Sequence, residues 1–234
     1  MMETIALEID GKRVTVASGS TILAAAEKAG TDIPVLCYFE HTSSKGLCRL
    51  CVVEVEGATT MQPACVALAQ NDSIIQTRSE NIDRIRRTIL EMLASTVDLS
   101  ESPDLLEMLL DYDAVPERFQ GGKQLLPDLI DDNPVFIRDY AKCVMCWRCV
   151  QVCAEDAQYA FAINFGGRGF ETSIATFFGK AMPETTCVFC GQCVGVCPSG
   201  ALKAKTEHLL ELGALPEEIF SETRMRRKSK RRRT

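Results

Sequence analysis

Twelve cysteines constrain this chain of 234 residues more than any other feature of its sequence. A secreted protein would use them for disulfides, but a chain of this length can bury a core without covalent cross-links, and its first residues lack the pattern of an export signal. Metal binding is therefore the better interpretation. Because there are only two histidines, His41 and His208, the metal must be held almost entirely by thiolates, which favours iron–sulfur clusters or zinc over calcium, magnesium or copper(II).

Eight of the cysteines form two runs with the same spacing, C-x2-C-x2-C-x3-C, and Pro198 follows the second run. This is the spacing of bacterial two-cluster ferredoxins, in which three neighbouring cysteines hold one [4Fe–4S] cluster and the fourth crosses to the other cluster. Structural zinc sites take four ligands each, and the close groups of three cysteines in these runs do not suit them. The spacing predicts one cluster on Cys143, Cys146, Cys149 and Cys197, and a second on Cys187, Cys190, Cys193 and Cys153.

Residues 1–78 have the hydrophobic pattern of a small domain with strands and one helix. The helix is predicted to begin after an N-cap at Ser20 and to end at Gly30, because these residue types favour those positions. The order β-β-α-β-β leaves the long loop between Cys37 and Cys51 outside the core, and long loops in compact domains are usually functional. Strands are predicted over 5–9, 14–16, 52–55, 59–62 and 73–76.

The remaining four cysteines have the spacing C-x10-C-x2-C-x13-C and can close on one metal centre. A structural zinc site would also accept four sulfurs and a C-x2-C pair. The ten-residue span suits a loop around a cluster better than a zinc knuckle, and His41 within it is expected to be a solvated surface residue. The predicted ligands are Cys37, Cys48, Cys51 and Cys65.

The residues around these four cysteines carry a family resemblance. They are Cys37-Tyr38, the run Gly46-Leu47-Cys48-Arg49-Leu50-Cys51-Val52-Val53-Glu54-Val55, and Pro63-Ala64-Cys65. This pattern resembles the N-terminal [2Fe–2S] domain of the large iron–sulfur subunit of respiratory NADH dehydrogenase, which iron-only hydrogenases and NAD-linked formate dehydrogenases share. The resemblance implies a β-grasp ferredoxin fold that holds one [2Fe–2S] cluster.

A helix is predicted over 79–97, where the hydrophobic period changes to that of an amphipathic helix. We expect its polar face to carry Arg84, Arg86 and Arg87. Its apolar face is expected to carry Ile82, Ile85, Ile89, Met92 and Leu93.

One cluster of the resembling family is missing from this sequence. In that family the helix leads into a His-x3-Cys-x2-Cys-x5-Cys segment that holds an additional [4Fe–4S] cluster. Here Val97 lies at about the histidine position, and no cysteine occurs between Cys65 and Cys143. A short helix over 104–110 and a small satellite core are expected in its place.

Two features near the two predicted [4Fe–4S] clusters need separate interpretation. Trp147 follows the second cysteine of the first run, where relatives usually have glycine, and its ring would either shield the first [4Fe–4S] cluster from water or pack against a partner. The insertion over 161–170 is glycine-rich but matches neither phosphate-binding motif, so we expect close backbone packing near a cluster rather than a nucleotide site.

A second resemblance covers nearly the whole chain. It rests on Asn133-Pro134-Val135-Phe136-Ile137-Arg138-Asp139-Tyr140, on the second cysteine run through Pro198, and on Lys205-Thr206-Glu207-His208-Leu209-Leu210-Glu211. These segments resemble the N-terminal iron–sulfur region of NAD(P)-linked formate dehydrogenase catalytic chains. The molybdopterin and hydrogen-activating domains of such enzymes have no counterpart in this sequence.

The expected architecture is α+β with four parts. They are a [2Fe–2S] β-grasp domain over 1–78, a helical linker over 79–132, a two-[4Fe–4S] ferredoxin domain of bacterial type over 133–208, and a C-terminal helix with a basic tail over 209–234.

No catalytic residue is predicted, because every cysteine is needed as a ligand and no Ser/His/Asp or H-E-x-x-H arrangement occurs. We therefore expect a subunit that relays single electrons within a multi-subunit, NAD(P)-linked complex of the formate dehydrogenase type. Its expected partners are a flavin- and NAD(P)-binding subunit and a catalytic dehydrogenase or hydrogenase subunit, with ferredoxin as a further candidate. The alternatives are a diaphorase-side subunit of a hydrogenase complex and, in a different class, a zinc-rich interaction protein that binds nucleic acid.

Charge is unevenly distributed along the chain. The segment Arg224–Thr234 holds eight basic residues and no acidic one, which leaves 18 basic against 32 acidic residues elsewhere, a net charge of −14. Such a body repels nucleic-acid phosphates, so the tail is expected either to remain solvated or to dock on an acidic partner. No apolar run approaches the ~20 residues that span a bilayer, and we expect a cytoplasmic protein.

Overall fold

The computed structural model describes residues 3–119, 123–124 and 126–224 and begins with a β-hairpin. Strands β1 (Thr4–Ile9) and β2 (Lys12–Ala17) pair antiparallel, and the two connecting residues, Asp10 and Gly11, have φ angles of 49° and 77°. Two left-handed residues in a two-residue connection match the right-handed twist of the strands. The predicted hairpin is confirmed.

The hairpin belongs to a five-stranded sheet with the order β2-β1-β5-β3-β4. Strand β1 pairs in parallel with β5 (Ile74–Gln76), which pairs antiparallel with β3 (Val52–Val55), and β4 (Gln62–Pro63) completes the edge. Helix α1 (Ile22–Lys28) packs its buried face against the sheet. The α+β class and all five predicted strands are confirmed, although β4 lies at 62–63 rather than 59–62 and three strands, not the two of the predicted order β-β-α-β-β, follow α1.

Thr21, and not the predicted Ser20, is the N-cap of α1. Its hydroxyl oxygen accepts a hydrogen bond from the N–H of Ala24 at 3.2 Å. The carbonyl of Ser20 instead accepts the N–H of Ala69, so this residue is paired with a neighbouring segment and the helix begins one residue later. At the other end Gly30 has a φ of 67°, as expected of a glycine after a helix.

Helix α2 (Glu80–Thr96) confirms the helix predicted over 79–97, but the predicted polar and apolar faces are only partly right. Its buried face is centred on Ile82, Arg86 and Leu90, each 0% exposed, whereas Met92 is 54% exposed. Arg86 therefore does not lie on a solvated face. Its guanidinium donates hydrogen bonds to the carbonyls of Leu50 and Val52, which lie beside strand β3 and would otherwise be buried without a donor.

The expected satellite core lies between α2 and helix α3 (Pro103–Asp111). Seven buried residues form it, contributed by the long cysteine-bearing loop, by α2 and α3, and by the first cysteine run. They are Leu36, Leu50, Leu90, Leu99, Leu105, Tyr112 and Val144. Because these residues come from segments far apart in the sequence, the satellite core joins the N-terminal domain to the cysteine-rich domain.

The cysteine-rich domain has two small antiparallel sheets, each of two strands. The first pairs β6 (Phe136–Arg138) with β9 (Leu202–Ala204), and the second pairs β7 (Ile163–Gly166) with β8 (Ser173–Thr176). Its helical elements are short. They are η2 (Tyr140–Lys142), α4 (Arg148–Gln151), η3 (Val152–Asp156), η4 (Gly169–Glu171), η5 (Phe177–Gly179), η6 (Met182–Glu184) and α5 (Gln192–Gly195).

Two domain boundaries differ from those expected. Helix α6 (Lys205–Glu211) continues across the boundary at 208/209 and is followed by α7 (Pro216–Thr223). Ile130, assigned to the linker, exchanges backbone hydrogen bonds with Arg138 of β6. The linker itself contributes α2, α3 and η1 (Pro116–Phe119).

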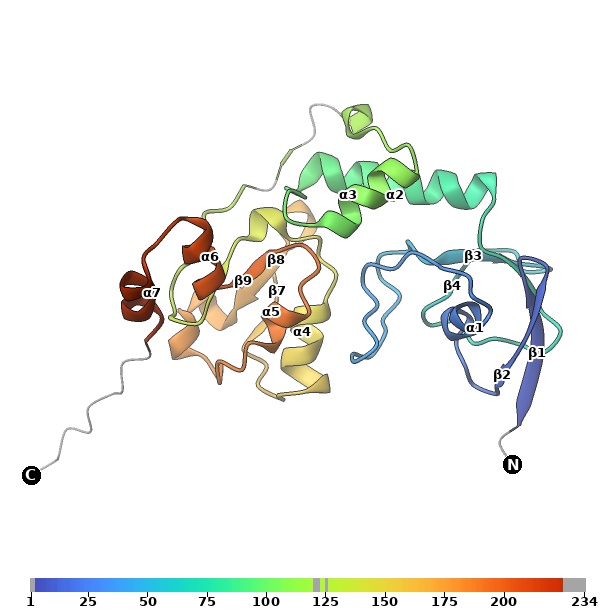
Figure 1. Ribbon diagram of the computed structural model, residues 1–234, viewed down its shortest axis with the longest axis horizontal. Helices are drawn as coiled ribbons and strands as arrows, with labels where there is room; N and C mark the ends of the chain where they lie inside the picture. The colour runs from blue at the N-terminus through green and yellow to red at the C-terminus, as the bar shows by residue number, and fades with distance from the viewer. Residues whose placement is uncertain (1–2, 120–122, 125, 225–234) are drawn as a thin grey trace, which may run out of the picture.

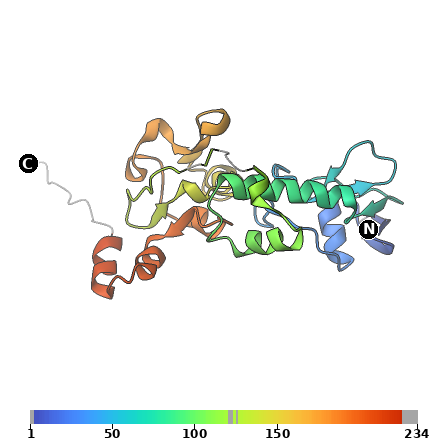
Figure 2. The ribbon, with the colours of Figure 1, turned by 90° about the horizontal axis from the view of Figure 1, so that it is seen from above.

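The N-terminal sheet lies at one end of the molecule and the cysteine-rich domain at the other, with α2 and α3 along one side (Figure 1). Seen from above, α2 lies over the middle of the molecule (Figure 2). Within the described ranges no helix has the length and apolar character needed to cross a bilayer. The basic tail falls outside the described residues apart from Arg224.

We expect Arg86→Ala to destabilise the protein by about 3 kcal/mol, because two buried carbonyls lose their donor and a void remains. At this chain length that loss lowers the midpoint of thermal unfolding by about 6–12 °C, measured by circular dichroism under anaerobic conditions. The control is Arg84→Ala on the exposed side of the same helix, which should shift the midpoint by less than about 2 °C. Equal midpoints for the two variants would contradict this role.

Candidate metal centres

The first group of cysteines lies on the long loop and at the edge of the N-terminal sheet. The Sγ atoms of Cys51 and Cys65 are 3.4 Å apart, and the backbone N–H of Cys48 donates to the Sγ of Cys37 at 3.5 Å. Thiols of Cys48 and Cys65 donate to Cys37 and lower its pKa, while the same contacts raise the pKa of each of the two donors. The structure thus brings all four predicted residues together.

The second and third groups surround two separate cavities in the cysteine-rich domain. The two cavities are small and similar, each with a volume of about 20 Å³. Apolar residues form most of the remaining lining, among them Ile174 in the first and Phe136 in the second. The cysteines around the first are Cys143, Cys146, Cys149 and Cys197, and those around the second are Cys153, Cys187, Cys190 and Cys193.

This arrangement has the predicted crossing of the chain: Cys153, from the first run, lies with the second run, and Cys197 lies with the first. The assignment of each cysteine as a ligand stays a prediction. The crossing has a simple cause, since α4 of the first run packs against α5 of the second, so each run ends beside the other run's cavity.

The donor sets fit iron–sulfur clusters. Burial raises the pKa of the Cys143 and Cys193 thiols to about 12 and that of Cys146 to about 11, so these sulfurs need a strong positive charge before they ionise. Four thiols around each cavity are the donor set that a [4Fe–4S] cluster requires.

The three groups are connected in a row. Cys48 of the first group and Cys146 of the second pack against the same buried cluster. Cysteines of the second and third groups pack against one common core. The second group is therefore next to both others.

Contacts between the long loop and the first cysteine run hold the first two groups together. Arg148 donates a hydrogen bond to the carbonyl of Tyr38, and its guanidinium lies 5.6 Å from the centroid of the Phe39 ring. Asp156 accepts hydrogen bonds from the N–H and hydroxyl of Ser43 at 2.7 and 2.9 Å. Sequence reasoning missed this interface, because nothing local marks which charged residues meet a loop more than 100 positions away.

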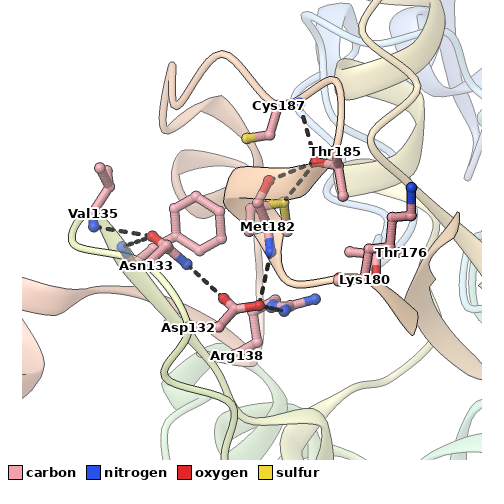
Figure 3. A network of polar contacts seen from close by, with 10 residues as sticks. Asp132, Asn133, Val135, Arg138, Thr176, Lys180, Met182, Thr185 and Cys187 are labelled. Carbon is pink, nitrogen blue, oxygen red and sulfur yellow. Dashed lines mark hydrogen bonds and ion pairs between the residues drawn. The ribbon is translucent and has the colours of Figure 1, made fainter. Parts of the chain in front are cut away.

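A polar network positions the start of the second cysteine run (Figure 3). Asp132 accepts hydrogen bonds from the guanidinium of Arg138 and from the N–H of Met182 at 2.9 Å. The carbonyl of Met182 accepts the hydroxyl of Thr185, whose oxygen in turn accepts the N–H of Cys187 at 3.1 Å. Strand β6 and the first cysteine of the second run are thereby connected through buried or half-buried groups.

Other predicted features are partly corrected. His41 is solvated as expected, with its side chain 74% exposed. The glycines of the insertion do not pack against a cysteine cavity: a Cβ on Gly166 would lie 2.9 Å from Ala175, and one on Gly167 would lie 2.4 Å from the carbonyl oxygen of Glu171. Their small size is required by the β7–β8 hairpin itself. Trp147 lines the first cavity and contacts Phe165.

Comparison with protein families assigns the same two units. Residues 2–80 match the family described as a 2Fe-2S iron-sulfur cluster binding domain. Residues 141–201 match the family described as a 4Fe-4S dicluster domain. The chain therefore carries sites for one [2Fe–2S] and two [4Fe–4S] clusters, and the zinc alternative is not favoured.

Similar proteins are subunits of redox enzymes. The chain is 34% identical over 206 residues to a subunit of an NADH-quinone oxidoreductase from Rhizobium meliloti (strain 1021), covering 85% of this chain and 24% of the relative. It is 35% identical over 212 residues to the HndD subunit of the NADP-reducing hydrogenase from Solidesulfovibrio fructosivorans, covering 86% and 36%. The chain thus spans well under half the length of these curated relatives.

A solved structure is similar over most of both chains. It is a chain from the crystal structure of an NAD⁺-reducing [NiFe]-hydrogenase in the H₂-reduced state, with a TM-score of 0.73 and 27% sequence identity. The match covers 86% of this chain and 87% of that chain. This similarity extends across both domains.

Replacing Cys153 by Ser tests the crossing. We expect Cys153→Ser to alter the cluster held by Cys187, Cys190 and Cys193, while the other [4Fe–4S] cluster keeps its electron paramagnetic resonance signal in the reduced protein. The matched variant is Cys197→Ser, which should have the mirror-image effect. The assignment fails if Cys153→Ser selectively removes the signal of the cluster beside Cys143.

Removal of iron should affect the two domains differently. The N-terminal core is apolar and continuous, whereas most cysteines of the other domain lie in or against its core, so we expect that core to depend on bound metal. After iron is removed with a chelator, hydrogen exchange should leave β1 and β5 protected and expose the amides of β6 and β9. Metal-loaded protein is the control, and equal loss of protection in both domains would contradict the expectation.

Proposed function

Because the chain carries a 2Fe-2S cluster binding domain and a 4Fe-4S dicluster domain, and is homologous to subunits of NADH- and NADP-linked oxidoreductases, we propose that it relays single electrons between redox sites on other subunits. The observation that carries this proposal is the packing of the three cysteine groups, in which the second group is next to both others. Clusters in a row give electrons a path along the molecule.

The satellite core supports a direct step between the first two groups. Cys48 of the first group and Cys146 of the second both pack against this core. Apolar side chains there exclude water without interrupting the contact between the loop and the first cysteine run. An electron therefore passes from one cluster to the next without a further centre between them.

Exposed apolar residues at both ends of the row support contacts with partners. Near the first group Leu47 is 44% exposed and Val66 38%. In the third group Cys190 is exposed. Thr186, just before the second run, donates a hydrogen bond to the carbonyl of Ala160, just before β7, and large exposed side chains lie in the second run and in the segments that flank β7 and β8 at the open end of their hairpin. They are Tyr159, Phe161, Phe177, Phe178 and Val188, each more than half exposed.

The partners in this proposal are a flavin- and NAD(P)-binding subunit at one end and a catalytic dehydrogenase or hydrogenase subunit at the other. The names of the relatives support an NAD(P)-linked complex, and two of the matches are from hydrogenases. None of the relatives reported above is a formate dehydrogenase, so the substrate of the complex stays a prediction. A diaphorase-side role in a hydrogenase complex is the second candidate, favoured by the match to the [NiFe]-hydrogenase chain over 87% of its length.

Anaerobic purification tests the proposal. We expect a brown protein with about ten iron atoms and about ten acid-labile sulfides per chain, since one [2Fe–2S] and two [4Fe–4S] clusters require them. Dithionite should reduce the clusters, and NADH should reduce them only after a flavin-containing NADH-oxidising subunit is added. Colourless, zinc-loaded protein contradicts the proposal, and so does rapid reduction by NADH of the isolated chain.

A further inference from the structure

The two cysteine runs have the same backbone conformation but different residues at one position. Trp147 has φ 74° and ψ −12°, and Gly191, at the same place in the second run, has φ 74° and ψ −1°. The residues two positions earlier, Met145 and Phe189, match as well, each with a φ of 55°. Left-handed backbone is normal for glycine and strained for a bulky residue. Trp147 keeps the glycine conformation in spite of its side chain.

Contacts of the indole ring account for this strained residue. The ring meets Phe165 edge to face, with the centroids 4.8 Å apart and the planes at 66°. Phe165 is on β7, opposite Ile174 of β8, and Ile174 lines the first cavity together with Trp147. The β7–β8 hairpin, inserted between the two runs, therefore holds the ring over the first cavity.

The second cavity has no such cover. A Cβ built on Gly191 would have no neighbour within 4 Å, and Cys190 is solvent-exposed. The two cavities are alike in volume and in their four sulfurs. Their cysteines differ in exposure, because Cys190 is exposed whereas all four cysteines around the first cavity are buried or half-buried.

We propose that Trp147 is a potential-setting residue, which excludes water from the first [4Fe–4S] cluster and holds its reduction potential below that of the second. Reduction adds negative charge to a cluster that is already anionic through its four thiolates, and a dry apolar environment disfavours that charge. A single electron shared by the two [4Fe–4S] clusters then resides mainly on the second one, whose predicted ligands include the exposed Cys190. The proposal rests on the presence of both clusters and adds an order of potentials to the proposed electron relay.

The experiment compares Trp147→Gly with Trp147→Phe in anaerobic, metal-loaded protein. Redox titration is followed by electron paramagnetic resonance, with signals assigned through the cysteine variants. In Trp147→Gly the reduction potential of the first cluster should rise, while that of the second should stay unchanged. Trp147→Phe keeps an aromatic ring against Phe165 and should restore the original potential. Phe165→Ala removes the support of the ring and should shift the first cluster in the same direction as Trp147→Gly.

A second measurement uses the fact that Trp147 is the single tryptophan of the chain. Its fluorescence should be quenched in the metal-loaded protein, and iodide, a water-soluble quencher, should reach it poorly. Release of iron should restore the emission. Strong emission from the loaded protein would place the ring away from the cluster and overturn the proposal.

Iron and sulfide assays on the same samples separate the two levels of inference. A wild-type protein without iron contradicts the proposed function. A fully loaded Trp147→Gly protein with unchanged potentials overturns the role of Trp147 alone, and so does an equal shift of both clusters or a Trp147→Phe shift as large as that of glycine. Loss of only the first cluster from Trp147→Gly would make the residue a structural support and would also overturn the proposal.

Discussion

The gathering of eight thiols in a domain of short strands is the constraint on which the rest of this structure depends. The four strands of the cysteine-rich domain have three or four residues each, and most of its cysteines lie in or against its core. Such a core gains little from hydrophobic burial alone, and buried thiols ionise only when a cation offsets the loss of hydration. Iron held by these thiolates would supply folding energy as well as redox chemistry, in a domain where regular secondary structure is sparse.

The N-terminal domain has an apolar core that does not depend on its cysteine-bearing loop. Its sheet and α1 form this continuous core, and the long loop contacts the cysteine-rich domain instead. The satellite core then makes the contact rigid, because Leu36 and Leu50 of the loop meet Leu90, Leu105 and Val144. The linker, which has no cysteine, thus contributes apolar packing, and the loop contributes to both a metal site and an interface.

Much of this could be predicted from the sequence because the signals were local. Cysteine spacing predicted all three groups, which the structure brings together, and alternation predicted the hairpin and the strands of the first domain. Arg86 was misplaced because helical periodicity counts an arginine as polar, whereas its guanidinium here satisfies carbonyls beside β3 that are distant in sequence. The Ser20 cap failed for a similar reason, since Ala69 already uses the Ser20 carbonyl. Tertiary hydrogen bonds decided both cases.

Left-handed backbone occurs at two kinds of aromatic residue in the cysteine-rich domain, one packed and the other exposed. At Trp147 a left-handed residue is covered by Phe165, so the strain is offset by packing over a closed cavity. At Tyr159, Phe161 and Phe178 the φ angles are 51°, 52° and 57°, yet the side chains are 59–86% exposed and gain little from packing within the chain. Strain that the fold does not offset is typical of functional surface. The strain at Trp147 is thus offset by packing beside the first cavity, whereas the strained aromatics before β7 and after β8 remain exposed.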